Sequence, residues 1–172
     1  YNMEWSDGIL EELSIPKHSL PEVKPSLSNF GNIDGVIKGP PITAILGDQQ
    51  AALFGQNCTG KGDVKNTYGT GCFALTNTGK DIIKSDNGLL TTVAYQMEGE
   101  DPFYALEGSV PIAGAAVQWL RDNLNIIKSS EEIESLAMGE KNNGDVYFVP
   151  AFSGLFSPHW DETARGSLFG LT

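Results

Sequence analysis

Prolines and glycines interrupt the hydrophobic pattern throughout the first forty positions, so this part of the sequence predicts mainly connecting segments. One short helix is expected there, with Ser6 or Asp7 as its cap and Pro16 at its end. Its apolar side consists of Ile9, Leu10 and Leu13. We expect that side to pack against something outside this chain.

A strand followed by a helix is predicted next. Residues 42–46 are mostly β-forming, and residues 49–54 favour a helix that Gly55 closes. Asp48 lies at the corner between the two elements. The polar, glycine-containing segment 57–63 predicts a hinge, which divides the sequence into residues 1–56 and 57–172.

An antiparallel hairpin is predicted beyond this hinge. Its strands are residues 64–68 and 72–78, which contain alternating β-forming positions around Gly69-Thr70-Gly71. Two further strands are expected over residues 89–95 and 103–106.

Helical periodicity replaces the strand pattern after Pro111, and apolar residues recur at helical spacing as far as Leu124. Ser129 and Glu132 form a capping-box pattern that opens a second, acidic helix. The positions expected to face inward on that helix are Ile133, Leu136 and Ala137. Residues 146–152 then predict a buried strand.

Composition and charge exclude several functional classes. The 172 residues include 22 acidic and 11 basic side chains, and the formal net charge of −11 disfavours binding to nucleic acid. Cys58 and Cys72 are too few for a disulfide scaffold and fit a reducing compartment, so we expect a cytoplasmic protein. No apolar run approaches the roughly 20 residues that span a bilayer. The start at Tyr1 lacks the form of a signal peptide, and we expect the sequence to begin within a longer protein.

Asp48 is the first candidate for chemistry. A carboxylate between a strand and a helix can accept a proton from a hydroxyl group in a cleft. Aspartate is also a favoured helix cap, and capping explains this residue type equally well. Gln49 has a similar ambiguity, because it can bind a substrate or simply be a solvated residue of the first helical turn.

The Gly69-Thr70-Gly71 turn is the second candidate. Glycines in a tight turn let backbone N–H groups approach a phosphate, and the threonine hydroxyl adds a donor. A hairpin turn without a ligand explains the same tripeptide. His159 near Asp161 has no accompanying hydrolase motif and is interpreted as a loop residue. The most direct interpretation of Trp119, Phe148 and Phe152 is a set of core aromatics, and the two cysteines are interpreted as small buried residues.

Two longer motifs carry a family resemblance. Residues 47–56 read Gly-Asp-Gln-Gln-Ala-Ala-Leu-Phe-Gly-Gln, and residues 65–73 read Lys-Asn-Thr-Tyr-Gly-Thr-Gly-Cys-Phe. Together they resemble the FGGY family of carbohydrate kinases, and residues 104–108, 114–122, 149–155 and 164–172 continue the likeness. The sugar kinases of that family usually have Gly-Thr-Ser-Gly in the phosphate turn, so the motif here favours glycerol as the substrate.

The resemblance implies an α/β, actin-like (ribonuclease H-like) ATPase fold, with a mixed sheet, flanking helices and two domains around a cleft. It implies that Asp48 is the base for a glycerol hydroxyl, Gln49 a glycerol contact and Phe73 an apolar wall of the glycerol site. The positions that it assigns to the nucleotide are Gly69, Thr70, Gly71, Gly114 and Gln118. It also implies ATP and Mg²⁺ as cofactors, with the metal ligands mostly outside this chain and none assigned within it.

The resemblance makes residues 1–56 the end of the first domain and residues 57–172 the first part of the second. Family members are longer than this chain, so we expect these residues alone to be inactive and the full-length kinase to act on glycerol, with a homo-oligomer as one option for its assembly. A non-catalytic actin-like module that binds nucleotide or a partner, and a kinase for another polyol, are the alternatives. Residues 31–39 contain no arginine, where bacterial members that bind fructose 1,6-bisphosphate have one, so that inhibition is not implied.

Overall fold

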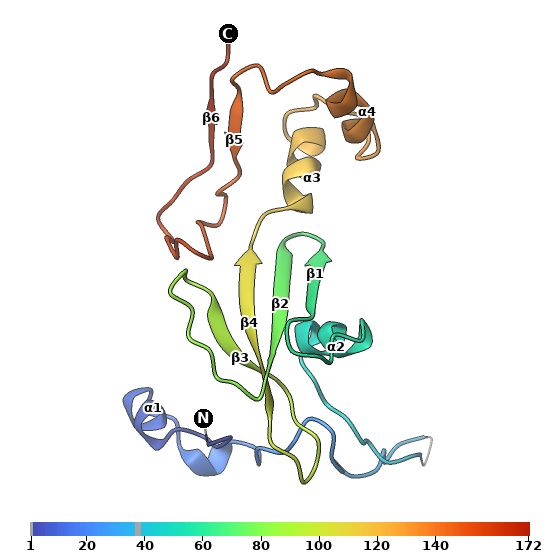
Figure 1. The fold of residues 1–172 in the computed structure, drawn as a ribbon, viewed down its shortest axis with the longest axis vertical. Helices are drawn as coiled ribbons and strands as arrows, with labels where there is room; N and C mark the ends of the chain where they lie inside the picture. Colours follow the sequence, from blue (N-terminus) through green and yellow to red (C-terminus); the bar gives the residue numbers. More distant parts are fainter. Residues whose placement is uncertain (1, 37–38) are drawn as a thin grey trace. The chain divides into compact units, whose positions relative to one another are not determined.

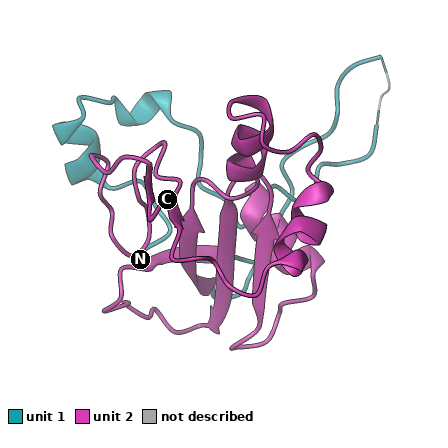
Figure 2. Ribbon diagram, turned by 90° about the horizontal axis from the view of Figure 1, so that it is seen from above, with its two compact units in different colours: residues 1–46, 95–102 teal, residues 47–94, 103–172 magenta. Residues whose placement is uncertain are grey.

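Strand pairing and local contacts divide the chain into two units. The computed structural model describes residues 2–36 and 39–172, so two positions of the arginine-free segment 31–39 lie outside the described residues. The first unit contains the residues up to 46 together with 95–102, and the second contains 47–94 together with 103–172 (Figure 2). The sequence-based boundary after residue 56 stays a prediction.

The first unit contains the short helix that the sequence predicts. Helix α1 spans Asp7–Glu12 and is followed by a 3₁₀ turn, η1, at Lys17–Ser19. Leu10 is buried, whereas Ile9 is 59% exposed and Leu13 is 62% exposed. The helix prediction is therefore confirmed, but only part of its apolar side is covered by this chain.

The strand predicted over residues 42–46 is wrong. Within it, only Ala44 forms an isolated bridge, with Leu27, and Pro41, just before the segment, forms another with Asn32. The pairing register changes between these two bridges, so the hydrogen bonds do not continue as a ladder. Pro41 has no N–H group to donate, which further limits pairing at that end.

The second unit is built on a four-stranded sheet (Figure 1). Its strands are β1 at Val64–Tyr68, β2 at Cys72–Gly79, β3 at Leu90–Tyr95 and β4 at Phe103–Val110, and the order is β1-β2-β4-β3. The last residue of β3, Tyr95, belongs to the first unit. Strand β2 pairs antiparallel with β1 and with β4. The predicted hairpin and the two further strands are confirmed.

Helix α2, at Asp48–Gly55, packs against β1 and β2 and confirms the predicted helix. Leu53 from this helix and Leu75 from β2 are both fully buried. Asn77 of β2 is fully buried and bonds to both ends of the segment between α2 and β1. Its side-chain amide donates to the Cys58 carbonyl (3.0 Å), and its backbone N–H donates to the Asp63 carbonyl (2.8 Å). The helix that carries Asp48 is thus held firmly against the hairpin.

Two helices and a small sheet follow β4. Helix α3 spans Gly114–Asp122 and helix α4 spans Glu132–Gly139. Strands β5 (Tyr147–Val149) and β6 (Ser167–Phe169) pair antiparallel. The buried strand predicted over residues 146–152 is therefore wrong in length and in burial, because it has only three residues and Tyr147 and Val149 are exposed.

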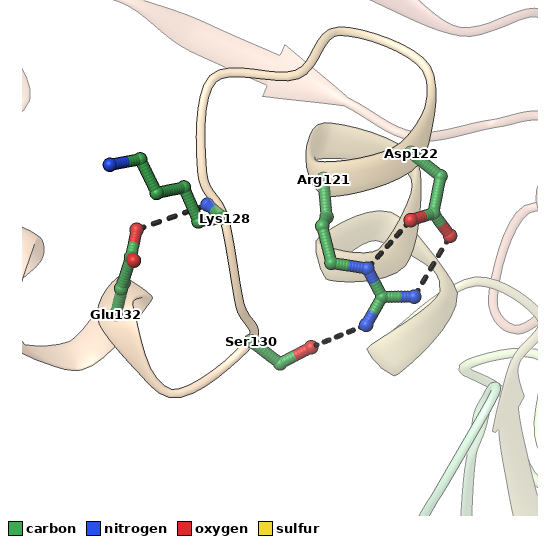
Figure 3. A network of polar contacts seen from close by, with 5 residues as sticks. All are labelled: Arg121, Asp122, Lys128, Ser130 and Glu132. Atoms are coloured by element: carbon green, nitrogen blue, oxygen red, sulfur yellow. Dashed lines mark hydrogen bonds and ion pairs between the residues drawn. The ribbon is translucent and has the colours of Figure 1, made fainter.

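The connection from α3 to α4 is polar (Figure 3). Arg121 donates to both carboxylate oxygens of Asp122, at 2.6 and 2.9 Å, and to the Ser130 hydroxyl at 3.4 Å. The hydrogen bond from Arg121 lowers the pKa of Asp122. These bonds join the end of α3 to the segment that leads into α4.

The start of α4 differs from the predicted capping box. Glu131 occupies the cap position without a side-chain bond to the helix, and Glu132 accepts from the Lys128 N–H at 3.0 Å (Figure 3). The prediction that Leu136 and Ala137 face inward is also wrong, because both are exposed. Periodicity identifies an apolar side, but burial needs a neighbouring element to cover it.

No helix within residues 2–36 and 39–172 is long and apolar enough to cross a lipid bilayer.

Candidate active site

Asp48 is the first residue of α2, and Gly47 takes the cap position ahead of it. The Asp48 side chain is exposed, and its Oδ1 accepts a hydrogen bond from the Gln49 N–H at 2.8 Å. The carboxylate therefore satisfies one amide of the first turn, although it is not the cap residue itself. An exposed carboxylate with a second oxygen is also able to accept a proton from a hydroxyl group.

Lys65 lies under the start of this helix and is only 5% exposed. Its Nζ donates to Gln49 Oε1, to Thr67 Oγ1 at 3.0 Å and to the Phe73 carbonyl at 3.0 Å. Burial lowers the pKa of Lys65, and the charges of Glu107 and Asp48 oppose that shift. This ammonium group therefore joins residues of α2, β1 and β2.

The sequence reasoning missed Lys65 as a functional residue. Its position in β1 could have indicated burial, because Lys65 pairs across the hairpin with Leu75, which is buried. Residues that are directly opposite in an antiparallel pair share a face of the sheet, so the lysine belongs to the face that α2 covers. Only the packing of α2 shows that this side chain is buried.

Phe73 belongs to the same face, since it pairs with Thr67. The Phe73 side chain is partly buried, and its carbonyl is one of the three acceptors around Lys65. The structure therefore brings Gln49 and Phe73, which are far apart in the sequence, to a single ammonium group. An open hollow beside Lys65 is lined by residues of α2, of β1 and of the segment between them, including Ala52, Gln56, Lys65 and Thr67.

The Gly69-Thr70-Gly71 turn contacts the start of α3. The Gly69 carbonyl accepts from the Gly114 N–H at 2.9 Å, and the Thr70 carbonyl accepts from the N–H groups of Ala113 and Ala115 at 2.8 and 3.2 Å. The structure thus brings together four of the five positions that the family resemblance assigned to a nucleotide. Among residues 2–36 and 39–172, nothing accepts a hydrogen bond from the exposed Thr70 hydroxyl.

At two of these glycine positions, the backbone of another segment lies too close for a side chain. A Cβ atom at Gly114 would lie 2.5 Å from the Gly69 carbonyl oxygen, and one at Gly71 would lie 2.5 Å from the Val110 carbonyl oxygen. The absence of a side chain therefore has a structural explanation at both positions. Gln118, the fifth position, is exposed one turn beyond Gly114 and so lies on the same side of α3.

The remaining candidates lie outside this network. His159 is an exposed loop residue, as expected. The ring centroid of Trp119 lies 5.5 Å from that of Phe148 and 5.0 Å from that of Phe152. Phe152 is nevertheless 39% exposed. Cys58 is buried, Cys72 is partly buried, and both are free thiols. In the described part of the chain, no group of three or more His, Cys, Asp or Glu residues could hold a metal ion.

Comparisons with known proteins match this chain to one family. Residues 64–172 match the C-terminal domain of the FGGY family of carbohydrate kinases. The glycerol kinase of Methylobacterium radiotolerans is 57% identical over 170 residues, which are 99% of this chain and 34% of that protein. The glycerol kinase of Brucella anthropi is 57% identical over 171 residues, with the same two coverages. The chain spans about a third of the length of these relatives.

Solved structures show the same fold. A crystal structure of Plasmodium falciparum glycerol kinase with ADP is 40% identical, with a TM-score of 0.84 over 99% of this chain and 35% of that one. The ligand-bound xylulose kinase of Lactobacillus acidophilus has a TM-score of 0.78 over 99% of this chain and 36% of that one, at 21% identity, and this likeness concerns the fold alone. The α/β, actin-like fold expected from the sequence is confirmed, and the pairings β1–β2, β2–β4 and β5–β6 are antiparallel.

Proposed function

The chain belongs to the FGGY family of carbohydrate kinases, and we propose that the full-length protein transfers the terminal phosphoryl group of ATP to glycerol. The names of the relatives support glycerol as the substrate, since the two glycerol kinases above are 57% identical to this chain. Because the chain is about a third as long as those proteins, we expect the 172 residues by themselves to be inactive.

One observation carries the proposal. Gln49 and Phe73, which the family resemblance assigned to the glycerol site, both accept a hydrogen bond from the ammonium group of Lys65, Gln49 through its side chain and Phe73 through its backbone carbonyl. Asp48, the assigned base, immediately precedes Gln49 and interacts electrostatically with the same lysine. A carboxylate and an amide near one fixed ammonium group, with Phe73 on the same face of the sheet, suit a small molecule that has both hydroxyl groups and a carbon backbone.

In the proposed reaction, the glycerol oxygen forms a bond to the terminal phosphorus of ATP, the bond from that phosphorus to ADP breaks, and ADP leaves. Asp48 accepts the proton that the glycerol hydroxyl loses. The proton goes to the exposed carboxylate, which Asp48 presents at the start of α2. Gln49 orients the substrate, and Phe73 packs against its carbon atoms. Positioning of this kind provides much of the catalysis in phosphoryl transfer, because the transition state is loose.

ATP with Mg²⁺ supplies the transferred group and neutralises its charge when bound. The residues of this chain that fit the nucleotide are those of the Gly69-Thr70-Gly71 turn, with its exposed threonine hydroxyl. The Gly114 N–H donates to the Gly69 carbonyl and is therefore not free to bind the nucleotide. We propose that Gly114 serves the nucleotide site by having no side chain, which lets the turn approach α3 closely. Gln118 is accessible from the same side of α3. We assign the Mg²⁺ ligands mostly to parts of the protein outside this chain.

The domain assignment is part of the same proposal. Residues 1–56 form the end of the first domain and residues 57–172 form the first part of the second. The family match, which covers residues 64–172, supports this division. The free thiols of Cys58 and Cys72 support a reducing, cytoplasmic location.

The test uses the full-length protein that contains this sequence. Phosphorylated product is measured with ATP and Mg²⁺ on a panel of glycerol and longer polyols, and the Asp48→Asn variant serves as the catalytic control. We expect glycerol to have the highest kcat/KM. Preference for another polyol would overturn the choice of substrate, whereas absence of turnover with every polyol would favour the non-catalytic alternative.

A further inference from the structure

The donor capacity of Lys65 is completely used. An ammonium group has three N–H donors and no acceptor. Lys65 Nζ has three oxygen partners, which are Gln49 Oε1, Thr67 Oγ1 and the Phe73 carbonyl. Thr67 and Phe73 belong to the sheet, so two of the three hydrogen bonds join the ammonium group to the sheet. The third joins it to Gln49 of α2.

This arrangement determines which end of the Gln49 amide faces outward. A primary amide has an acceptor oxygen at one end and a donor NH₂ group at the other. Because the lysine can only donate, Gln49 must turn its oxygen toward Lys65. The NH₂ group then points away from the lysine.

The outward NH₂ group is also accessible. Gln49 is partly buried, yet its Nε2 donates to no atom of residues 2–36 and 39–172. No buried side-chain nitrogen or oxygen in that part of the chain lacks a hydrogen-bond partner, so Nε2 is open to solvent or ligand. Next to it, Asp48 is exposed and has only oxygen acceptors when ionised.

We infer that Lys65 is a positioning residue, which fixes the Gln49 amide so that Nε2 donates to a substrate oxygen beside the proton-accepting carboxylate of Asp48. The inference rests on the proposed function and deepens it. Asp48 and Gln49 then form an acceptor–donor pair, and such a pair is complementary to a polyol, whose hydroxyl groups both donate and accept. Without the lysine, the amide is free to rotate and either end can face the substrate.

The decisive variant is Gln49→Glu, which changes the outward group and keeps the inward one. Glutamate has nearly the same shape and retains an oxygen toward Lys65, but it replaces the outward NH₂ donor with an acceptor oxygen. We expect the KM for the polyol to rise by about tenfold or more with little change in the KM for ATP, because a required donor is lost. A smaller change would show that the substrate uses an acceptor of Gln49 or none, and would overturn the inference.

Gln50→Glu is the matched control. It introduces the same charge in the same helical turn, close to Asp48 in sequence. The Gln50 side-chain oxygen lies over Gly47, only 2.7 Å from where a Cβ atom at that glycine would be. We expect Gln50→Glu to leave the polyol KM near the wild-type value. An equal rise in both variants would assign the effect to charge alone and overturn the inference.

A second measurement tests the lysine itself. Lys65→Met removes the donors and keeps a long apolar stem, and Lys61→Met is the control at an exposed lysine paired with Asp81. We expect Lys65→Met to raise the polyol KM in the wild-type background but to have little further effect in Gln49→Ala, because the lysine acts through the amide. Independent, multiplicative effects would mean that Lys65 is only structural. If Lys65→Met does not fold, the Gln49→Glu result decides alone.

Failure of this inference is distinguishable from failure of the proposed function. All variants are measured with the polyol that the wild-type protein phosphorylates best, whichever it is. A best substrate other than glycerol would overturn the proposed substrate and leave the test of Lys65 intact. Absence of turnover with every polyol would overturn both.

Discussion

Replacing Asp48 by Asn separates proton acceptance from helix stabilisation. The substituted side chain would keep an oxygen at the position where Oδ1 of Asp48 accepts the Gln49 N–H, at 2.8 Å. It would lose the negative charge and the ability to take up a proton at neutral pH. The two interpretations of this residue therefore forecast different results for one substitution.

The stability change is expected to be small. Asp48 is exposed and is not the cap residue, so its charge at the helix N-terminus contributes about 0.3–1 kcal/mol. Lys65 is also attracted by Glu107, more strongly than by Asp48, and that larger attraction remains in the variant. The loss of a general base, by comparison, lowers kcat by roughly 10² to 10⁴, which corresponds to about 3–5 kcal/mol in the activation barrier. Catalysis should change far more than folding.

The assay measures steady-state kcat for glycerol in the full-length protein and a thermal melt on the same preparation. The matched control is Asp7→Asn, because Asp7 is the exposed first residue of α1 and has a charged partner in Lys17 at 2.7 Å. We expect Asp7→Asn to leave kcat unchanged. The ATP KM of Asp48→Asn should also stay near the wild-type value, since the substitution is not in the phosphate turn.

A variant that retains most of its kcat would refute the assignment of Asp48 as the base. The carboxylate would then be explained by its hydrogen bond to the first helical turn alone. A large fall in melting temperature together with kcat would point to misfolding and would contradict the small structural contribution worked out above.

Single contacts give three further predictions. Phe73→Ala should raise the KM for glycerol more than that for ATP, and stability should fall by no more than about 3 kcal/mol because the ring is only partly buried; unchanged KM values would make Phe73 purely structural. Gly114→Ala should raise the KM for ATP and lower stability by about 1–3 kcal/mol, because its Cβ atom would lie 2.5 Å from the Gly69 carbonyl oxygen; a wild-type melt and ATP KM would contradict this. The hydrogen bond from the Thr163 hydroxyl lowers the pKa of Asp161 below its ordinary 3.8, so its stabilising contribution is present above that pH and is lost as the pH falls below it. Asp161→Asn should therefore weaken the acid dependence of the melting temperature, and identical acid profiles would refute this.

Local patterns determined much of the second unit. The alternation around Gly69-Thr70-Gly71 predicted the hairpin of β1 and β2, and the periodicity after Pro111 predicted α3. These elements depend mainly on turn chemistry and on residues within a few positions of one another, which the sequence displays directly. The motifs at Asp48 and at the turn were found for the same reason.

Other features depend on what packs against each element. Residues 42–46 are β-forming, yet their one bridge, at Ala44, does not continue in register to the bridge at Pro41, and no strand results. Leu136 and Ala137 follow a helical pattern, yet no described element covers them. In each case the local pattern favours a strand or a buried helix face. Whether that structure forms depends on a second segment, distant in the sequence, that pairs with it or covers it.

Lys65 shows most clearly what the tertiary structure decided. As a lysine in a β-strand, it indicates a solvated position, because burial of an unpaired charge is costly. The structure buries it because α2 packs over β1 and because Gln49, sixteen positions earlier, supplies an acceptor together with Thr67 and Phe73. The orientation of the Gln49 amide follows from that burial. A sequence shows which groups are available to bond, but desolvation, which makes those bonds obligatory, arises only when distant segments exclude water together.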